Sequence, residues 1–376
     1  MSSTTTSQLP ESYKGLYFTS SSAPPEVTSF PAPTVDVGSV IIKPLYCWIP
    51  GYINDVYSNS NPRGYPVPFP AVGGQNAVGR VVAVPSDAAK LKVGDLVIVD
   101  PTIHPRDDPT QIMLLAFVAP SAEMQGLARG VWTHGTWAEL LKAPLETVHR
   151  VDEAALQKHG ATPRDLVFVG LMSVPYGGLR DVNLIAGETV LISPATGSFG
   201  GAAVHVALAM GARVIAMGRN EKVLGELRDL APGRVETVKL SGSWQADHAA
   251  IAQYGPVDVF LDMTPQTATN TDHIRAGLFS LRHGGRMSLM SSVAEIAIPP
   301  AFLEAMAVTI RATMMCTYKQ EEDLVKLVQS GVLKLGEKAG LKIQGAFKIE
   351  EFDKAFEAAE KESSAGRAFV FTPNEE

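Results

Sequence analysis

The chain has 376 residues, a length that allows two domains, each with its own apolar core. Its 32 Lys and Arg residues against 39 Asp and Glu residues give a net charge of −7, and no dense basic run is present, so nucleic acid is not an expected partner. Only two cysteines are present, which excludes a disulfide-stapled fold. No apolar stretch reaches the ~20 residues that span a bilayer, and the N-terminus lacks signal-peptide features. We therefore expect a cytoplasmic protein with no membrane partner.

The N-terminal part of the chain predicts β structure. The first 37 residues are rich in Ser, Thr and Pro and indicate an extended lead-in with one strand near residues 16–18. Short runs rich in β-branched residues follow at 40–42, 78–84 and 96–99, separated by Gly, Pro, Asn and Asp. This pattern favours an antiparallel β domain, with few helix signals before about residue 153.

The middle of the chain alternates strand and helix. A helix of small residues is expected at 200–210, and apolar strands are expected at 189–193, 213–217, 257–261 and 286–290. Such alternation predicts a parallel sheet covered by helices. Beyond residue 310 we expect helices around 324–328 and 349–359 and a final strand at 367–372.

A glycine-containing turn joins the strand 189–193 to the helix 200–210. Gly197 and Gly200 are three residues apart, which lets the backbone approach a pyrophosphate whose charge is met by free N–H groups at the helix N-terminus. A dinucleotide site is the prediction, and a merely tight turn is the alternative. The expected binding residues of the turn are Ala195, Thr196, Gly197, Ser198, Phe199 and Gly200.

Four short motifs occur in the order and spacing of one known family. They are LKVGDLV at 91–97, GTWAE at 135–139, AGETVLI at 186–192 and RHGGR at 282–286. On these motifs the chain resembles the medium-chain dehydrogenase/reductase superfamily, which contains zinc alcohol dehydrogenases and zinc-free quinone and enone reductases. One departure is Pro194, which stands where the family usually has the first Gly of the turn.

The resemblance implies an α/β fold of two domains. A GroES-like β domain is expected from residues 1–155, and a Rossmann domain with a doubly wound parallel sheet is expected from residues 156–309. Residues 310–376 are expected to return to the first domain.

The resemblance also locates the zinc ligands of alcohol dehydrogenases at positions that hold none here. Pro50 stands where the first ligand Cys would lie, and Gly74 replaces the His of the family's GHE segment. Cys47 could join His104 or His134 in an unusual site, but their spacing favours a buried thiol and ordinary surface histidines. We therefore expect no bound metal.

Without a Lewis acid, hydride addition to an activated acceptor is easier than oxidation of a simple alcohol. The resemblance thus implies an NADPH-dependent, zinc-independent oxidoreductase that transfers a hydride to the activated C=C bond of an enone or to a quinone. Two alternatives stay open. One is a zinc-free alcohol or ketone oxidoreductase, and the other is a degenerate relative that binds a dinucleotide without chemistry.

The preference for NADPH is expected from the end of the second strand of the parallel sheet. NAD-dependent relatives carry an acidic residue there, whereas this chain has Gly218, Arg219 and Asn220. The guanidinium of Arg219 would grip a 2′-phosphate, and the alternative is a solvated Arg at a strand end. By resemblance to an Arg of the family's closing strand, Arg367 is expected to contact the pyrophosphate, with an interdomain structural role as the alternative.

The catalytic candidates also come from the resemblance. Residues 51–57 are similar to the NxxDxY stretch of zinc-free quinone reductases, although Asn54 and Asp55 are adjacent here. This implies that Tyr52 or Tyr57 donates to the oxyanion formed during reduction, and packing in the cleft wall is the alternative.

The substrate is expected to be a small hydrophobic or aromatic molecule. The residues that would line its apolar pocket, with core packing as the alternative, are Trp48, Phe69, Phe117 and Trp132. The segment 111–132 is a candidate substrate lid or interface element. Residues 287–291 could continue a sheet across a homodimer.

Overall fold

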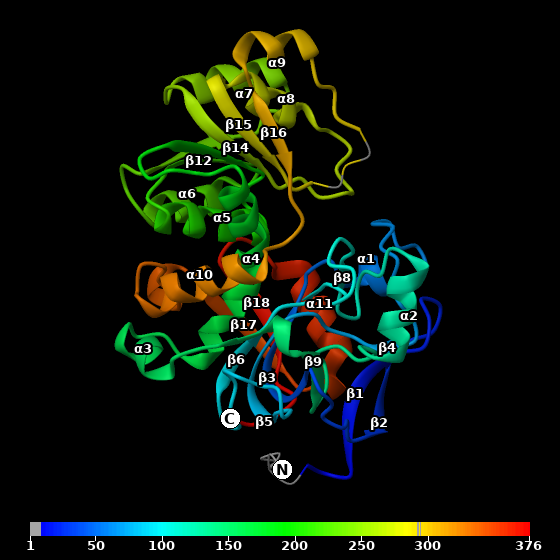
Figure 1. The fold of residues 1–376 in the computed structure, drawn as a ribbon. Coiled ribbons are helices and arrows are strands. Elements are labelled where there is room, and N and C mark those ends of the chain that lie inside the picture. Colours follow the sequence, from blue (N-terminus) through cyan, green and yellow to red (C-terminus); the bar gives the residue numbers. More distant parts are fainter. Residues whose placement is uncertain (1–8, 292, 294) are drawn as a thin grey trace. The chain divides into compact units, whose positions relative to one another are not determined.

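The computed structural model describes residues 9–291, 293 and 295–376, which form two compact units (Figure 1). The first unit contains the residues up to Gly170 together with Lys342–Ser363 and Ala368–Glu376, and the second contains Leu171–Leu341 and Ser364–Arg367. These limits lie later in the chain than the expected 155 and 309. None of the helices in the described part of the chain has the length and apolarity that crossing a bilayer requires.

An antiparallel sheet built around the long strand β3 (Ser39–Ile49) forms the first unit. Nine of the eleven β3 residues are buried and only Lys43 and Tyr46 are half-buried, which suits a central strand. The strand order is β10-β6-β5-β3-β18-β17, with β9 also paired to β3. The other strands are β5 (Ala77–Ala83), β6 (Leu96–Val99), β9 (Leu141–Pro144), β10 (Val148–Arg150), β17 (Lys342–Phe347) and β18 (Arg367–Phe371).

Smaller elements complete the first unit. The lead-in forms two strands rather than the one expected, because β1 buries Tyr13, Leu16 and Phe18 and the more polar β2 pairs with it along its whole length. Their sheet has the order β2-β1-β4, and a separate pair joins β7 and β8. The bounds are β1 (Ser12–Phe18), β2 (Glu26–Pro31), β4 (Ala71–Val72), β7 (Thr102–Ile103), β8 (Met113–Leu114), α1 (Ile53–Tyr57), α2 (Ala122–Gly130), α3 (Glu153–Lys158) and α11 (Phe352–Glu362).

The second unit is a parallel six-stranded sheet with the order β13-β12-β11-β14-β15-β16. This is the doubly wound order in which the chain reverses direction between its first and fourth strands, here β11 and β14. The predicted Rossmann fold class is therefore confirmed. The strands are β11 (Thr189–Ser193), β12 (Arg213–Gly218), β13 (Val235–Lys239), β14 (Val257–Asp262), β15 (Leu281–Leu289) and β16 (Thr309–Ala312).

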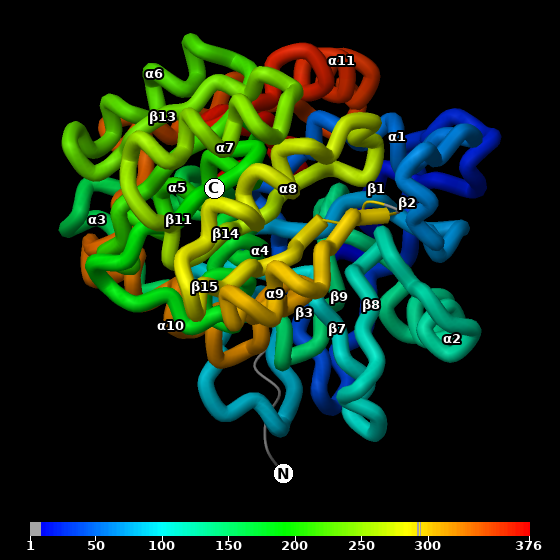
Figure 2. Tube along the Cα trace, turned by 90° about the horizontal axis from the view of Figure 1, so that it is seen from above, coloured from blue at the N-terminus to red at the C-terminus, as the bar shows by residue number. Residues whose placement is uncertain are grey.

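Helices cover both faces of this sheet (Figure 1). Helices α7, α8 and α9 lie on one face (Figure 2). Their apolar side chains belong to a core cluster that includes Leu191, Phe260 and Met287. On the other lie α5 and α6. Their bounds are α5 (Ser198–Ala209), α6 (Glu221–Asp229), α7 (Trp244–Ala252), α8 (Asp272–Phe279) and α9 (Pro300–Met306).

The expectation that residues 287–291 continue a sheet across a homodimer is wrong for this fold. Residues 286–289 of β15 pair with β16 on one side, and β14 pairs with β15 on the other. The strand is therefore interior, and β16 occupies the edge of the sheet. The short, mostly exposed β16 has no apolar run, which is why the sequence pattern did not reveal it.

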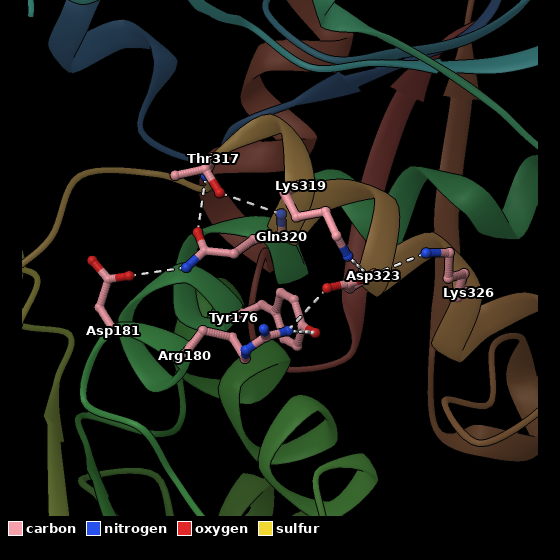
Figure 3. Close-up of polar contacts among 8 residues, drawn as sticks. All are labelled: Tyr176, Arg180, Asp181, Thr317, Lys319, Gln320, Asp323 and Lys326. Atoms are coloured by element: carbon pink, nitrogen blue, oxygen red, sulfur yellow. Dashed lines mark hydrogen bonds and ion pairs between the residues drawn. The ribbon is translucent and has the colours of Figure 1, made fainter. Parts of the chain in front are cut away.

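Helix α10 (Tyr318–Gln329) is fixed to α4 (Val167–Asp181) by polar contacts (Figure 3). The Asp181 carboxylate accepts from Gln320 at 2.9 Å, and Arg180 donates to Asp323 at 3.4 Å. Buried Cys316, just before the helix, donates to the Ser173 carbonyl at 2.8 Å. Because of these contacts α10 belongs to the second unit, which extends to Leu341 instead of ending at 309.

A pair of helical glycines tests this packing. A Cβ at Gly177 of α4 would lie 2.1 Å from the Met315 carbonyl oxygen, whereas a Cβ at Gly225 of α6 would meet nothing within 4 Å. We expect Gly177→Ala to lower the free energy of unfolding by about 1–3 kcal/mol through overpacking. Gly225→Ala should raise it by about 0.5–1 kcal/mol, because alanine loses less backbone entropy in a helix. Urea denaturation measures both, and shifts of equal sign would contradict the packing described.

Candidate functional site

The turn between β11 and α5 brings the helix backbone very close to the strand end. A Cβ at Gly200 would lie 2.1 Å from the Pro194 carbonyl oxygen, so this position requires glycine. A Cβ at Gly197 would meet nothing within 4 Å, and Gly197 itself is exposed. Gly200 thus serves packing, while Gly197 leaves an open approach to the backbone of the turn.

The first turn of α5 is not capped by a side chain. Its N-cap is Gly197, which cannot offer one, and the helix runs for 12 residues. The N–H groups of the first turn carry the partial positive charge of the helix and suit an anionic ligand. The turn is anchored from both sides, because the Ala195 N–H donates to Met217 at 2.7 Å and the Thr196 carbonyl accepts from Ala365 at 3.1 Å. Ala195 and Gly200 are buried, and Thr196, Ser198 and Phe199 are half-buried.

The end of β12 lies against this turn. A Cβ at Gly218 would be 2.5 Å from the Thr196 methyl group, so the strand end also needs glycine. Arg219 is exposed and forms no ion pair with any residue that the structure describes. Asn220 is committed to its helix, since its Oδ1 accepts from the Val223 N–H at 3.2 Å as the N-cap of α6. Of the three residues, Arg219 is the side chain available to a ligand.

Arg367 has a partner within the second unit. Its Nη2 donates to both carboxylate oxygens of Glu226 at 2.9 and 2.8 Å, and its Nη1 donates to Ser364 at 3.1 Å. A pyrophosphate would have to compete with the Glu226 carboxylate for this guanidinium.

Buried polar atoms gather where the strand order reverses. Ser193 ends β11, Asp262 ends β14 and Ser288 lies in β15, and all three side chains have 0% exposure. Ser193 Oγ, Asp262 Oδ2 and Ser288 Oγ have no hydrogen-bond partner among the described residues. Burial raises the pKa of Asp262. Dinucleotides bind outside the carboxyl ends of the strands at such a reversal, so these orphaned atoms fit a polar ligand there.

Asp262 is connected to His273 by hydrogen bonds through Thr264. The Thr264 N–H donates to Asp262 Oδ1 at 3.1 Å, and the Thr264 hydroxyl contacts both Asp262 and the ring of His273, the latter at 2.6 Å. Burial and the charge of Arg219 lower the pKa of His273, against the opposing charges of Asp247 and Asp272. Our sequence analysis missed this network. The signal that could have found it is the acid that ends the apolar strand VDVFLD.

In the first unit, aromatic rings surround Tyr57. Its ring stacks on Phe18 at 4.2 Å and lies 6.3 Å from Phe117 and 6.0 Å from Phe69. Its hydroxyl donates to the Ala116 carbonyl at 2.7 Å, and burial raises its pKa. The single O–H of Tyr57 is therefore already used inside the core.

Tyr52 lies at the edge of the same aromatic group. It is half-buried, and its ring is 6.3 Å from Trp48 and 6.4 Å from Phe117. The Arg63 guanidinium lies over the ring, 4.2 Å from its centroid. Burial raises the pKa of Tyr52, so the phenol stays protonated at neutral pH. Trp132, the remaining pocket candidate, is 9% exposed and makes no ring contact within the described part of the chain.

A small cavity behind Trp48 does not hold a substrate. It measures about 10 Å³ and is lined by residues that include Tyr46, Trp48, Asn76 and Gly170. That space suits about one water molecule. The lid candidate 111–132 is tied to its own unit, because Met113 and Leu114 pair with β7 and the Ala119 N–H donates to Pro66 at 2.9 Å.

The loop at Gly73 and Gly74 has no room for side chains. Gly74 has φ +96°, and a Cβ there would lie 2.5 Å from Thr136 Oγ1 and 2.6 Å from the Trp137 ring. A Cβ at Gly135 would lie 2.2 Å from the Gly74 carbonyl oxygen. The next side chain, Gln75, is 8% exposed, and its Nε2 finds no partner among the residues described.

Residues 38–153 match the family model described as the alcohol dehydrogenase GroES-like domain. The acryloyl-coenzyme A reductase of Metallosphaera sedula is 25% identical over 81% of this chain and 84% of its own length. The mitochondrial enoyl-[acyl-carrier-protein] reductase of Caenorhabditis elegans is 26% identical over 57% of this chain and 54% of its own. A short chain alcohol dehydrogenase from E. coli CFT073, complexed with NADH, superposes with TM-score 0.76 and 16% identity, covering 96% of this chain and 100% of that one.

The GroES-like match and the doubly wound sheet that follows it agree with the family resemblance of the sequence. Together they support membership of the medium-chain dehydrogenase/reductase superfamily. Within that superfamily the loop at Gly74 matters most, because the resemblance places the zinc-binding His of alcohol dehydrogenases there. In this chain the backbone at that position is closed by Thr136 and Trp137.

The residues considered for an unusual metal site are engaged separately. Cys47 donates to the Thr136 carbonyl at 3.0 Å, and burial raises its pKa. His134 hydrogen-bonds the Tyr13 hydroxyl at 2.5 Å, and burial lowers its pKa to about 4. His104 pairs with the Gln111 carbonyl at 2.7 Å. Over residues 9–291, 293 and 295–376, no group of three His, Cys, Asp or Glu side chains could hold a metal ion.

Proposed function

We propose that the protein is an NADPH-dependent, zinc-independent reductase that transfers a hydride to a C=C bond conjugated to a carbonyl, or to a quinone. The observation that carries the proposal is the closed backbone at Gly74, where a ligand side chain would collide with Thr136 and Trp137. Hydride addition to a conjugated acceptor does not need the Lewis acid that alcohol oxidation needs. The acryloyl-coenzyme A and enoyl-[acyl-carrier-protein] reductases are named for unsaturated acyl groups, which is the substrate chemistry proposed here.

The second unit supplies the groups that would hold the dinucleotide. The uncapped N–H groups at the start of α5 would bind its pyrophosphate, and Arg219 would bind a 2′-phosphate. The orphaned Ser193, Asp262 and Ser288 atoms offer further polar contacts at the reversal of the sheet. The chemistry that bound NADPH supplies is the hydride.

The first unit must then stabilise the charge that appears on the substrate. Hydride addition to the β-carbon leaves negative charge on the carbonyl oxygen, which is costly in a dry site without a donor. The Tyr57 hydroxyl donates its hydrogen bond to the Ala116 carbonyl inside the core, so we assign this role to Tyr52. Its raised pKa keeps the proton available for donation at neutral pH.

An assay of NADPH oxidation tests the activity. We expect NADPH absorbance to fall with enones, quinones or unsaturated acyl thioesters, and simple alcohols to reduce NADP⁺ slowly or not at all. Elemental analysis should find much less than one zinc per chain, and a chelator should leave turnover unchanged. Turnover restricted to alcohols and ketones would favour the first alternative, and dinucleotide binding without turnover on any substrate would favour the degenerate one. A stoichiometric zinc required for turnover would overturn the zinc-independent assignment.

The choice of cofactor is tested at Arg219. Changing Arg219→Ala should raise the KM for NADPH at least about tenfold, because charge-assisted hydrogen bonds to the 2′-phosphate are lost. The KM for NADH should change little. Arg228→Ala is the matched control, since Arg228 is an exposed arginine of α6 with only a 3.9 Å contact to Asp229. Equal effects of Arg219→Ala on the two cofactors would refute the assignment.

Two conservative variants separate the tyrosines. Tyr52→Phe should lower turnover by ~10²–10³ while the protein keeps its stability, as expected for a donor that acts in the transition state. Tyr57→Phe should keep near wild-type turnover but lower the free energy of unfolding by about 1–3 kcal/mol, since the buried Ala116 carbonyl loses its donor. If Tyr52→Phe retains full turnover, the proton comes from elsewhere.

A further inference from the structure

Arg63 is a mostly buried cation at the edge of the aromatic group of the first unit. Its side chain is only 12% exposed, and its guanidinium carbon lies 4.2 Å from the centroid of the Tyr52 ring. The ring that it covers belongs to the residue assigned above to the substrate oxygen. A cation over an aromatic face is attracted by the ring quadrupole, and the attraction is stronger where water is excluded.

The partners of Arg63 leave much of its hydrogen-bonding capacity unused. Its Nε donates to Asp55 Oδ2 at 3.3 Å, and it hydrogen-bonds the Tyr65 hydroxyl, which opposes the rise that burial causes in the pKa of Tyr65. No other partner of its terminal nitrogens lies among the described residues. A guanidinium has five N–H donors in a planar fork, so the outer edge of this one can still donate to two oxygens of one group.

The Asp55 contact is weaker than a full ion pair between buried groups. It uses Nε alone, and the Asp55 side chain is 40% exposed and therefore well solvated. A structural ion pair of Arg would gain most from the bidentate geometry seen between Arg80 and Glu153, in which two nitrogens donate to the two carboxylate oxygens at 2.8 and 3.0 Å. Arg63 does not form this two-nitrogen contact with Asp55.

We propose that Arg63 binds an anionic oxygen group of the substrate, a carboxylate or a phosphate, and thereby makes the enzyme prefer charged over neutral conjugated acceptors. This inference rests on the proposed function, and it names the substrate class for the site at Tyr52. The aromatic rings of Tyr52, Tyr65 and Phe117 accommodate the apolar part of such a molecule. The ring centroids of Tyr65 and Phe117 are 5.1 Å apart. The guanidinium fork fixes its charged end.

Asp55 is then a competitor for the same guanidinium. Removing its charge by Asp55→Asn frees Arg63 for the ligand, so anion binding should become several-fold tighter. Removing the cation by Arg63→Gln should weaken it. An ion pair that only stabilises the loop predicts that both changes act in the same direction. The opposite signs are therefore specific to an anion site.

A binding measurement tests this without relying on catalysis. Calorimetry with crotonate and with inorganic phosphate should show that Arg63→Gln raises the Kd of at least one of them about tenfold or more. Arg63→Lys, which keeps the charge but loses the fork, should give an intermediate value. The control is Arg129→Gln, an exposed arginine of α2 that should leave both Kd values unchanged. A response to crotonate identifies a carboxylate, and a response to phosphate alone identifies a phosphate. Equal Kd values in wild type and Arg63→Gln for both probes would overturn the proposal.

A kinetic comparison separates this proposal from the proposed function. Monomethyl fumarate and dimethyl fumarate are conjugated acceptors that differ by one negative charge. Arg63→Gln should lower kcat/KM about tenfold or more for the monoester, mainly through KM, and leave the diester nearly unchanged. Equal losses on both esters would refute the role of Arg63. If the wild type reduces neither these esters nor any other conjugated acceptor, the proposed function fails, while the calorimetric result still decides for or against the anion site.

Discussion

The packing around the proposed substrate site depends on the close approach of two backbone segments of the first unit, residues 73–74 and 135–137. The Gly73 and Gly74 carbonyls accept from the N–H groups of Trp137 and Thr136 at 2.9 and 3.1 Å, and Gly135 donates to Val72 at 2.8 Å. Cβ atoms at the three glycines would lie within 2.2–2.7 Å of neighbouring atoms, so the contact exists only because they have no side chains. Trp137, with 0% exposure, closes the space and donates through Nε1 to the Trp48 carbonyl at 3.1 Å.

This backbone contact also determines which nearby polar side chains are buried in the core and which stay outside it. It places the Gly74 N–H against the Tyr57 hydroxyl, which already donates to Ala116, so Tyr57 is built into the same core. It occupies the position from which a zinc-binding His would project in the alcohol dehydrogenases that the chain resembles. Tyr52 and Arg63, one helical turn and a short loop away, stay outside this core, half-buried and partly reachable. The two side chains that we propose for substrate binding therefore lie outside the packed region around the three glycines.

The sequence predicted elements well where burial makes a strand apolar on both faces. β11, β12 and β14 are continuous apolar runs, and their expected limits agree with the structure to within a residue. β13, β16 and β17 alternate buried or half-buried with exposed side chains, or lie at an edge, and no run marks them. Among site residues, the glycines of the turn were readable because their spacing is local. The hydrogen bond of the Tyr57 hydroxyl could not be predicted, because its acceptor Ala116 lies 59 positions away in the chain.

A short C-terminal segment, residues 364–367, belongs to the second unit, and the chain passes from it directly back into the first unit. Within the second unit, Ala365 donates to the Thr196 carbonyl at 3.1 Å and lies so close to Gly201 that a Cβ there would be 2.3 Å from its own. Arg367 fastens the segment to Glu226. The next residues, Phe369–Phe371, pair with β3 in the first unit. The short segment 364–367 therefore packs on the proposed dinucleotide turn in the second unit, and the residues that directly follow it in the chain belong to the sheet of the first unit. Because a Cβ at Gly201 would collide with Ala365, a side chain there would displace a segment whose next residues form β18, so glycine at this position also protects the start of that strand.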